Sequence, residues 1–89
     1  MVTYDGSKRQ INFNKHNIDL VDCECVFDTL MLTDEDVREP YGEQRLKSLC
    51  WLNGRVVVLV WTDREIGPHL ISCRYGDKHE TQRYFNTFL

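Results

Sequence analysis

The chain has 89 residues, a formal net charge of −3 and 42% hydrophobic residues. These values predict a single domain over residues 1–89 with one modest core, and they argue against a disordered chain. No apolar run approaches the roughly 20 residues that cross a bilayer, and no apolar stretch follows the first charges, so we expect a cytoplasmic protein with no membrane partner.

The negative net charge counts against nucleic-acid binding, because contacts with phosphates depend on Lys and Arg. The charges are unevenly distributed, however. Acidic residues gather in residues 33–43, whereas residues 7–16 contain basic residues and no acid. A local basic patch is therefore compatible with the net charge.

The first predicted helix covers about residues 7–16, after a short strand candidate at residues 2–4, and Asp5 or Ser7 is its expected N-cap. One face of this helix carries polar side chains at the spacing i, i+4, i+7 and i+8, namely Lys8, Asn12, Lys15 and His16. An Asn inside a helix needs a partner, so we expect Asn12 to bind a neighbouring backbone.

A second helix is predicted over residues 19–30, capped by Asn17 or Asp19, although its Val and Cys residues would also suit a strand. The cysteines of the chain do not have the spacing of a zinc or disulfide site, so we expect reduced and mostly buried thiols. No cofactor is indicated.

Residues 30–33 are a short strand candidate, and the acidic segment after them reads as a loop. The strands at residues 45–52 and 55–62 are joined by Asn53 and Gly54, the pair that best fits a two-residue type I′ hairpin. A second hairpin through residues 63–68 leads to a strand at residues 69–74.

The last predicted helix begins after Asp77, which forms a capping box with Glu80. We expect Phe85 and Phe88 to be buried with Thr81 on its inner face, with contact to a protein partner as the alternative. These elements predict an α+β fold in which an antiparallel sheet packs with two N-terminal helices and one C-terminal helix.

Regular hairpins would pair Leu52 with Arg55 and Thr62 with His69. This register places Arg45, Lys47, Thr62 and His69 together on one face, near one end of the sheet. The same register puts Arg74 opposite Val57 and on the other face, so the arginines need not converge.

Several motifs occur in an order typical of one family. They are "DGSKRQINFNKH", with the pattern Asp-x-x-Lys-x-x-x-Asn-x-x-Lys-His, then "VFD", "GEQR", "TDR" and finally "ISCR" followed by Glu and Tyr. Over nearly the whole chain, this order resembles the BrnT family, toxins of type II toxin–antitoxin modules. The resemblance implies a RelE-like fold, a ribonuclease activity that halts translation, and neutralisation by a BrnA-type antitoxin that also binds operator DNA.

The positions that match the family pattern are Lys8, Asn12, Lys15, His16, Arg45, Arg64, Arg74, Glu80 and Tyr84. The chain departs from the pattern at His69, where an arginine is usual, and at Cys73 and Gly76. Members of the family are often more basic than this chain. These departures leave the expected fold intact and bear on catalytic strength and substrate preference.

RNA can be cut without a metal ion when its 2′-hydroxyl attacks the adjacent phosphorus, which requires a base, an acid and positive charge near the phosphorane. Arg64 and Arg74 are the expected stabilisers of that charge, because a guanidinium binds two phosphate oxygens. Simple surface ion pairs with Asp63, Glu65 or Asp77 are the competing interpretation. If both arginines lay in ion pairs without an open basic groove, the nuclease hypothesis would lose its support.

His16 is a candidate acid or base, or a favourable residue at a helix C-terminus. Glu80 is a candidate base that its capping role also explains. Tyr84 would stack on a base, contact a phosphate or pack in the core. Phosphate binding is the expected role of four other residues: Lys8, Lys15, Arg45 and Lys47.

Trp51 and Trp61 fit the core or an interface better than an RNA-stacking surface. The leading hypothesis is a ribonuclease toxin acting on RNA. Two alternatives stay open: a catalytically inactive binding or regulatory subunit, favoured by the negative charge and by His69, and a general nucleic-acid binder without chemistry.

Overall fold

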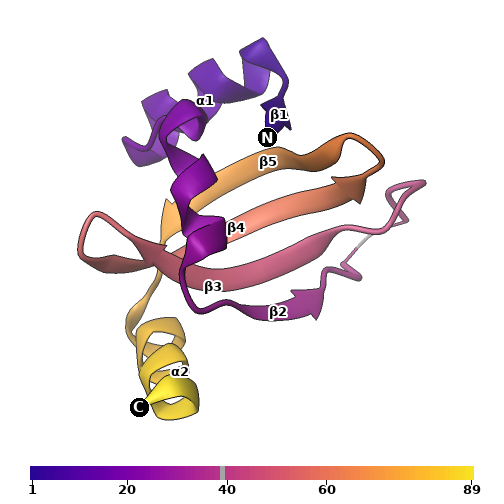
Figure 1. Cartoon of the computed structure of the whole chain (residues 1–89). Helices are drawn as coiled ribbons and strands as arrows, with labels where there is room; N and C mark the ends of the chain where they lie inside the picture. The colour runs from indigo at the N-terminus through magenta and orange to yellow at the C-terminus, as the bar shows by residue number, and fades with distance from the viewer. Residues whose placement is uncertain (39) are drawn as a thin grey trace.

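The structure, a computed structural model, describes residues 1–38 and 40–89. It is an α+β fold whose sheet has the strand order β1-β5-β4-β3-β2 (Figure 1). The strands are β1 (Thr3–Tyr4), β2 (Leu32–Glu35), β3 (Leu46–Leu52), β4 (Arg55–Arg64) and β5 (Gly67–Tyr75). β1 runs parallel to β5 and the other neighbours are antiparallel, so the sheet is mixed and the expectation of a purely antiparallel sheet is wrong.

Among the described residues the sheet is accompanied by three helices: α1 (Gly6–His16), η1 (Leu20–Asp28) and α2 (Lys78–Phe88). Asp5 caps α1 by accepting a hydrogen bond from Ser7 N, and Asp19 caps η1 in the same way through Val21 N. The second predicted helix is therefore present, but it is a 3-10 helix rather than an α-helix. Asn17 ends α1 in the left-handed conformation instead of capping the next helix.

The hairpin between β3 and β4 confirms the prediction from its two turn residues. Asn53 and Gly54 have φ values of 55° and 73°, the positive values that a type I′ turn requires at both central positions. The predicted pairs Leu52 with Arg55 and Thr62 with His69 are both present.

Two apolar cores lie on opposite faces of the sheet. The larger core joins η1 to one face and contains Leu20, Cys23, Cys50, Leu59 and Cys73. All four cysteines are free thiols and only Cys25 is exposed, as expected for reduced, mostly buried thiols. Trp61 packs against this core, as its strand position predicts.

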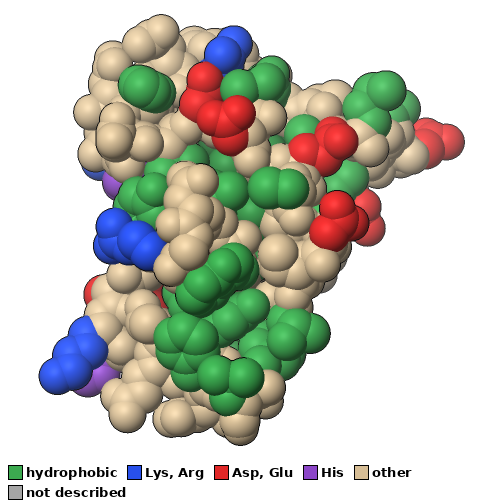
Figure 2. Space-filling model, turned by 60° about the vertical axis from the view of Figure 1, so that its left-hand side comes forward, with side chains coloured by type: hydrophobic (Ala, Val, Ile, Leu, Met, Phe, Trp, Pro, Cys, Tyr) green, Lys and Arg blue, Asp and Glu red, His purple; other side chains and the backbone are tan. Residues whose placement is uncertain are grey.

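The smaller core lies on the other face, at one end of the sheet. There α2 packs Tyr84, Phe85 and Phe88 against Leu49 and Val58 of the strands and against Leu32 and Trp51. The predicted burial of Phe85 and Phe88 is therefore partial, and the fully enclosed residue of α2 is Tyr84. In the lower part of Figure 2 hydrophobic side chains form a continuous area on the surface around α2.

One irregularity in β5 determines what this second face carries. The pairing of β4 with β5 shifts between Val60 and Trp61, whose partners are Ser72 and Leu70, so Ile71 is an extra residue in β5. Arg74 therefore pairs with Val58, and the predicted pairing with Val57 is wrong. Because one extra residue reverses the faces of all that follow, Arg74 lies on the same face as Lys47.

No helix among the described residues is both long enough and apolar enough to cross a membrane.

Candidate active site

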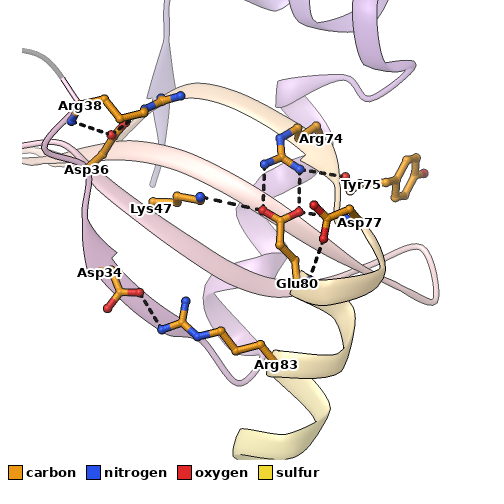
Figure 3. Close-up of polar contacts among 9 residues, drawn as sticks. All are labelled: Asp34, Asp36, Arg38, Lys47, Arg74, Tyr75, Asp77, Glu80 and Arg83. Atoms are coloured by element: carbon orange, nitrogen blue, oxygen red, sulfur yellow. Dashed lines mark hydrogen bonds and ion pairs between the residues drawn. The ribbon is translucent and has the colours of Figure 1, made fainter.

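Arg74 lies at the centre of an ion-pair cluster where the first turn of α2 meets the sheet. Its Nη1 and Nη2 donate to Oε1 and Oε2 of Glu80 at 2.8 and 2.9 Å, the bidentate geometry that a phosphate would also accept. Lys47 Nζ approaches Glu80 Oε2 at 3.9 Å from β3. Figure 3 shows Lys47 and Arg74 converging on Glu80 from two strands.

Glu80 has two structural tasks in this cluster. Its carboxylate accepts a hydrogen bond from Asp77 N while Asp77 caps Glu80 N, which confirms the predicted capping box. The hydrogen bonds from Arg74 lower the pKa of Glu80 to about 2 despite its partial burial. A carboxylate with so low a pKa is a weak base, so this position suits the orientation of Arg74 better than proton abstraction.

Arg74 keeps part of its binding capacity. Hydrogen bonds to Glu80 and to Tyr75 O use three of its five N–H donors among the described residues, and 39% of its side chain is exposed. A phosphate can therefore reach the guanidinium without displacing Glu80.

A groove of about 250 Å³ opens beside this cluster, between α2 and β2. Its walls include Asp34, Asp36, Arg38, Lys47, Glu80 and Arg83. Arg83 binds Asp34 at 2.9 Å and Arg38 binds Asp36 at 2.8 Å, so both cations of the outer wall are paired with acids (Figure 3). The groove thus has mixed charge and is not strongly basic.

The polar face of α1, formed by Lys8, Asn12, Lys15 and His16 and called the α1 stripe below, lines a second hollow of about 190 Å³ beside β5. Lys8, Lys15 and His16 border it together with Ser72, next to the bulge. Burial first, and then the charges of Lys15 and Arg74, lower the pKa of His16, so its imidazole is neutral at pH 7. A neutral imidazole near Arg74 has the protonation state that a general base needs.

Asn12 joins α1 to the edge of β5, as predicted. Its amide group donates to Cys73 O at 2.9 Å and accepts from Cys73 N at 2.9 Å, and it also donates to Ile18 O. These bonds satisfy backbone groups that the edge of β5 would otherwise leave unpaired, and they hold the α1 stripe beside Arg74.

Arg64 lies far from Arg74. It pairs with Gly67 at the opposite end of β4, six residues from the Val58 position that pairs with Arg74, which corresponds to about 20 Å along the strand. One scissile phosphate cannot contact both guanidinium groups. Arg64 Nη2 donates to Glu43 Oε1 at 2.9 Å in a partly exposed ion pair.

Tyr84 does not contribute to the site. Its side chain is buried, its ring stacks with Trp51, and its hydroxyl donates to Leu30 O at 3.0 Å. Core packing, one of the predicted alternatives, therefore explains the position of Tyr84.

Sequence reasoning missed Arg38 and Arg83 as walls of the groove. Arg83 follows Glu80 by three residues in α2, a spacing that places both side chains on one helical face. Arg38 had no comparable pattern, because it lies in the loop after β2. Residues 1–38 and 40–89 contain no group of three or more His, Cys, Asp or Glu side chains arranged to hold a metal ion.

Comparison with known proteins identifies the family to which this chain belongs. A family model described as "Ribonuclease toxin, BrnT, of type II toxin-antitoxin system" matches residues 4–80. A search of curated proteins finds no match. The matched segment runs from β1 to the first turn of α2, and so includes the α1 stripe, Arg74 and Glu80. The chain therefore belongs to the BrnT family of ribonuclease toxins of type II toxin–antitoxin systems, which implies an RNA target and an antitoxin partner.

Proposed function

We propose that this protein is an endoribonuclease toxin that cuts RNA beside Arg74 without a metal ion and thereby inhibits translation. The observation that carries the proposal is the convergence of Arg74 and Lys47 on one face of the sheet, with His16 close enough for the charge of Arg74 to lower its pKa. The five-stranded sheet with its flanking helices is the basis for inferring a RelE-like fold.

The chemistry follows from these residues. A neutral His16 takes the proton of the RNA 2′-hydroxyl, the 2′-oxygen forms a bond to the adjacent phosphorus, and the bond from phosphorus to the 5′-oxygen breaks. The leaving 5′-oxygen takes a proton from a protonated group or from water. The products are a 2′,3′-cyclic phosphate and a 5′-hydroxyl.

Arg74 and Lys47 stabilise the charge on the phosphorane oxygens. Glu80 is a positioning residue, because its bidentate ion pair fixes the plane of the Arg74 guanidinium before RNA arrives. Lys8 and Lys15 bind neighbouring phosphates from the α1 stripe. A BrnA-type antitoxin would neutralise the enzyme, and operator DNA would be bound through that antitoxin alone.

Expression of the lone chain tests this proposal. The wild-type protein should arrest growth and, once purified, cleave RNA in the presence of a metal chelator. Arg74→Ala should lower cleavage at least about 100-fold, the effect of removing one strong donor to a developing oxyanion. Arg55→Ala is the matched control, because Arg55 stacks on Tyr75 on the opposite face.

A specific observation favours a second candidate, a catalytically inactive binding subunit. Arg38, Arg64, Arg74 and Arg83 each lie in an ion pair with a carboxylate, so no described arginine of this face is without an acidic partner except Arg45. Arg64 and Arg74 are thus both paired beside a groove that is not strongly basic, which is the arrangement expected to weaken the nuclease hypothesis. Normal growth and intact RNA at good levels of folded protein would support this candidate and contradict the nuclease proposal.

A further inference from the structure

The face of the sheet that carries Arg74 continues beyond α2 as a row of polar side chains. Successive positions of β4 on this face are Val58, Val60, Thr62 and Arg64, spaced about 7 Å apart. Arg74 pairs with Val58, while Lys47 and Ser72 both pair with Val60. His69 pairs with Thr62, and Arg45, one residue before the β3 pairing begins, lies next to the same position.

Basic side chains therefore accumulate at the far end of this face as well as beside α2. Arg64 Nη2 donates to Glu43 Oε1 at 2.9 Å, and this hydrogen bond lowers the pKa of Glu43, which lies near Arg45 and His69 as well. The Glu43 carboxylate is thus an anion of the protein itself that lies near three basic side chains, those of Arg45, Arg64 and His69. Its ion pair with Arg64 is partly exposed on both sides, and exposed ion pairs contribute little to stability, so a phosphate can compete with it.

The Arg45 side chain is held in place by its neighbours, and no acid pairs with it among the described residues. Its guanidinium lies 3.9 Å from the centroid of the Tyr41 ring, and Thr62 Oγ1 donates to Gln44 O at 2.7 Å, which ties the preceding loop to β4. Arg45 Nε is buried and has no hydrogen-bond partner among the described residues. His69 is oriented by a 2.7 Å hydrogen bond between its Nδ1 and Thr3 Oγ1, which leaves Nε2 on the other side of the ring.

We propose that Arg45, Arg64 and His69 form a second phosphate-binding site that anchors the RNA strand at a distance from the cut. This inference depends on the proposed function, because it assigns the substrate a path: a single strand lying along the sheet from Arg74 to Arg64. The two ends lie about 20 Å apart, which corresponds to about six nucleotides of a stacked strand and fewer of an extended one. The substrate class is therefore single-stranded RNA long enough to cover both ends, and shorter RNA reaches the chemistry without the anchor.

The test compares cleavage of a trinucleotide and of an RNA of about 12 nucleotides that share one cleavage sequence. Wild-type kcat/KM should be at least about 10-fold higher on the longer RNA, the effect of about one hydrogen bond to a charged group. The double variant Arg45→Gln with Arg64→Gln should lose most of this length advantage through a higher KM. Arg74→Ala should instead lose kcat on both RNAs.

The affinity of the protein for the same RNAs tests the anchor without cleavage. In these RNAs a 2′-deoxy nucleotide at the cut removes the attacking hydroxyl, so the RNA stays intact and only its binding is measured. The longer RNA should bind the wild-type protein more tightly than the double variant, while Arg55→Ala binds like wild type. Circular dichroism melting identifies variants that fail to fold. If the Gln double variant fails to fold, the variant Arg45→Lys with Arg64→Lys replaces it, because lysine keeps the positive charge but lacks the planar guanidinium that binds two phosphate oxygens. Equal losses on short and long RNA, or no length dependence in the wild type, would overturn the anchor while leaving the nuclease proposal intact.

Discussion

At the scale of single residues, Glu80 determines what Arg74 does. Its carboxylate meets the guanidinium, the Lys47 ammonium and the N-terminal backbone of α2 at once. The sequence predicted the capping box, because Asp77 and Glu80 stand three residues apart. It did not predict the ion pair, because that contact depends on how α2 folds back onto β5.

Glu80→Gln should remove the negative charge of this side chain and keep its capping role, since a Gln at the same position also completes a capping box. The variant therefore measures the contribution of the charge alone. The folded-state pKa of about 2 lies below the usual 4.5, so Glu80 stabilises the fold fully above about pH 4.5 and progressively less as pH falls toward 2. We expect the variant to lose up to about 3 kcal/mol in its free energy of unfolding at pH 7. Its kcat should also fall, because Arg74 loses its orientation.

Urea denaturation at pH 7 and at pH 3 measures the stability difference. Glu65→Gln is the control, because Glu65 is exposed in the turn before β5. A difference between wild type and Glu80→Gln that does not shrink at low pH would show that the charge of Glu80 is not the source of the stability.

At the scale of elements, the strands and turns followed from the sequence and the faces of β5 did not. Asn53 and Gly54 fixed the first hairpin, since few other pairs accept positive φ at both positions. Ile71 then enters β5 as an extra residue and moves Arg74 to the face of Lys47. No local pattern distinguishes such a bulge from a regular strand, because the extra residue is accommodated by pairing with β4 and by the contact with α1.

Asn12 is the residue through which α1 meets that edge, and Asn12→Ala should be costly. The change leaves Cys73 N, Cys73 O and Ile18 O without their buried partner, which we expect to lower the free energy of unfolding by about 2–4 kcal/mol. Asn14→Ala should cost under about 1 kcal/mol, because Asn14 is exposed and bonds only with Gln10.

Chemical denaturation of both variants measures the difference. Amide hydrogen exchange at Cys73 provides a local readout, because its N–H loses the Asn12 acceptor and should exchange faster. Equal stability losses in the two variants would contradict the role of Asn12 as the link between α1 and β5.

At the scale of the whole molecule, a chain of net charge −3 brings several basic side chains to one face of its sheet, but it also places acids there that pair with most of the arginines. Sequence reasoning found most of these basic side chains, because Arg45, Lys47 and His69 share a face by strand alternation and the register of Thr62 with His69. It placed Arg64 and Arg74 in one catalytic role, although Arg64 ends β4 and Arg74 lies in β5 opposite Val58, about 20 Å away along the sheet. The predicted register already indicated that the two arginines need not converge, but it placed Arg74 on the wrong face because it did not include the extra residue Ile71.

The most direct test of the account is to locate RNA on the protein by NMR. A single-stranded RNA with a 2′-deoxy nucleotide at the cut is titrated into the wild-type protein, and backbone amide shifts are followed. We predict the largest changes at Lys47, Ser72, Arg74 and His16, around the proposed cut. Changes confined to η1 or to the far end of α2, with none at these residues, would contradict the assignment of the cleavage site to the cluster around Arg74.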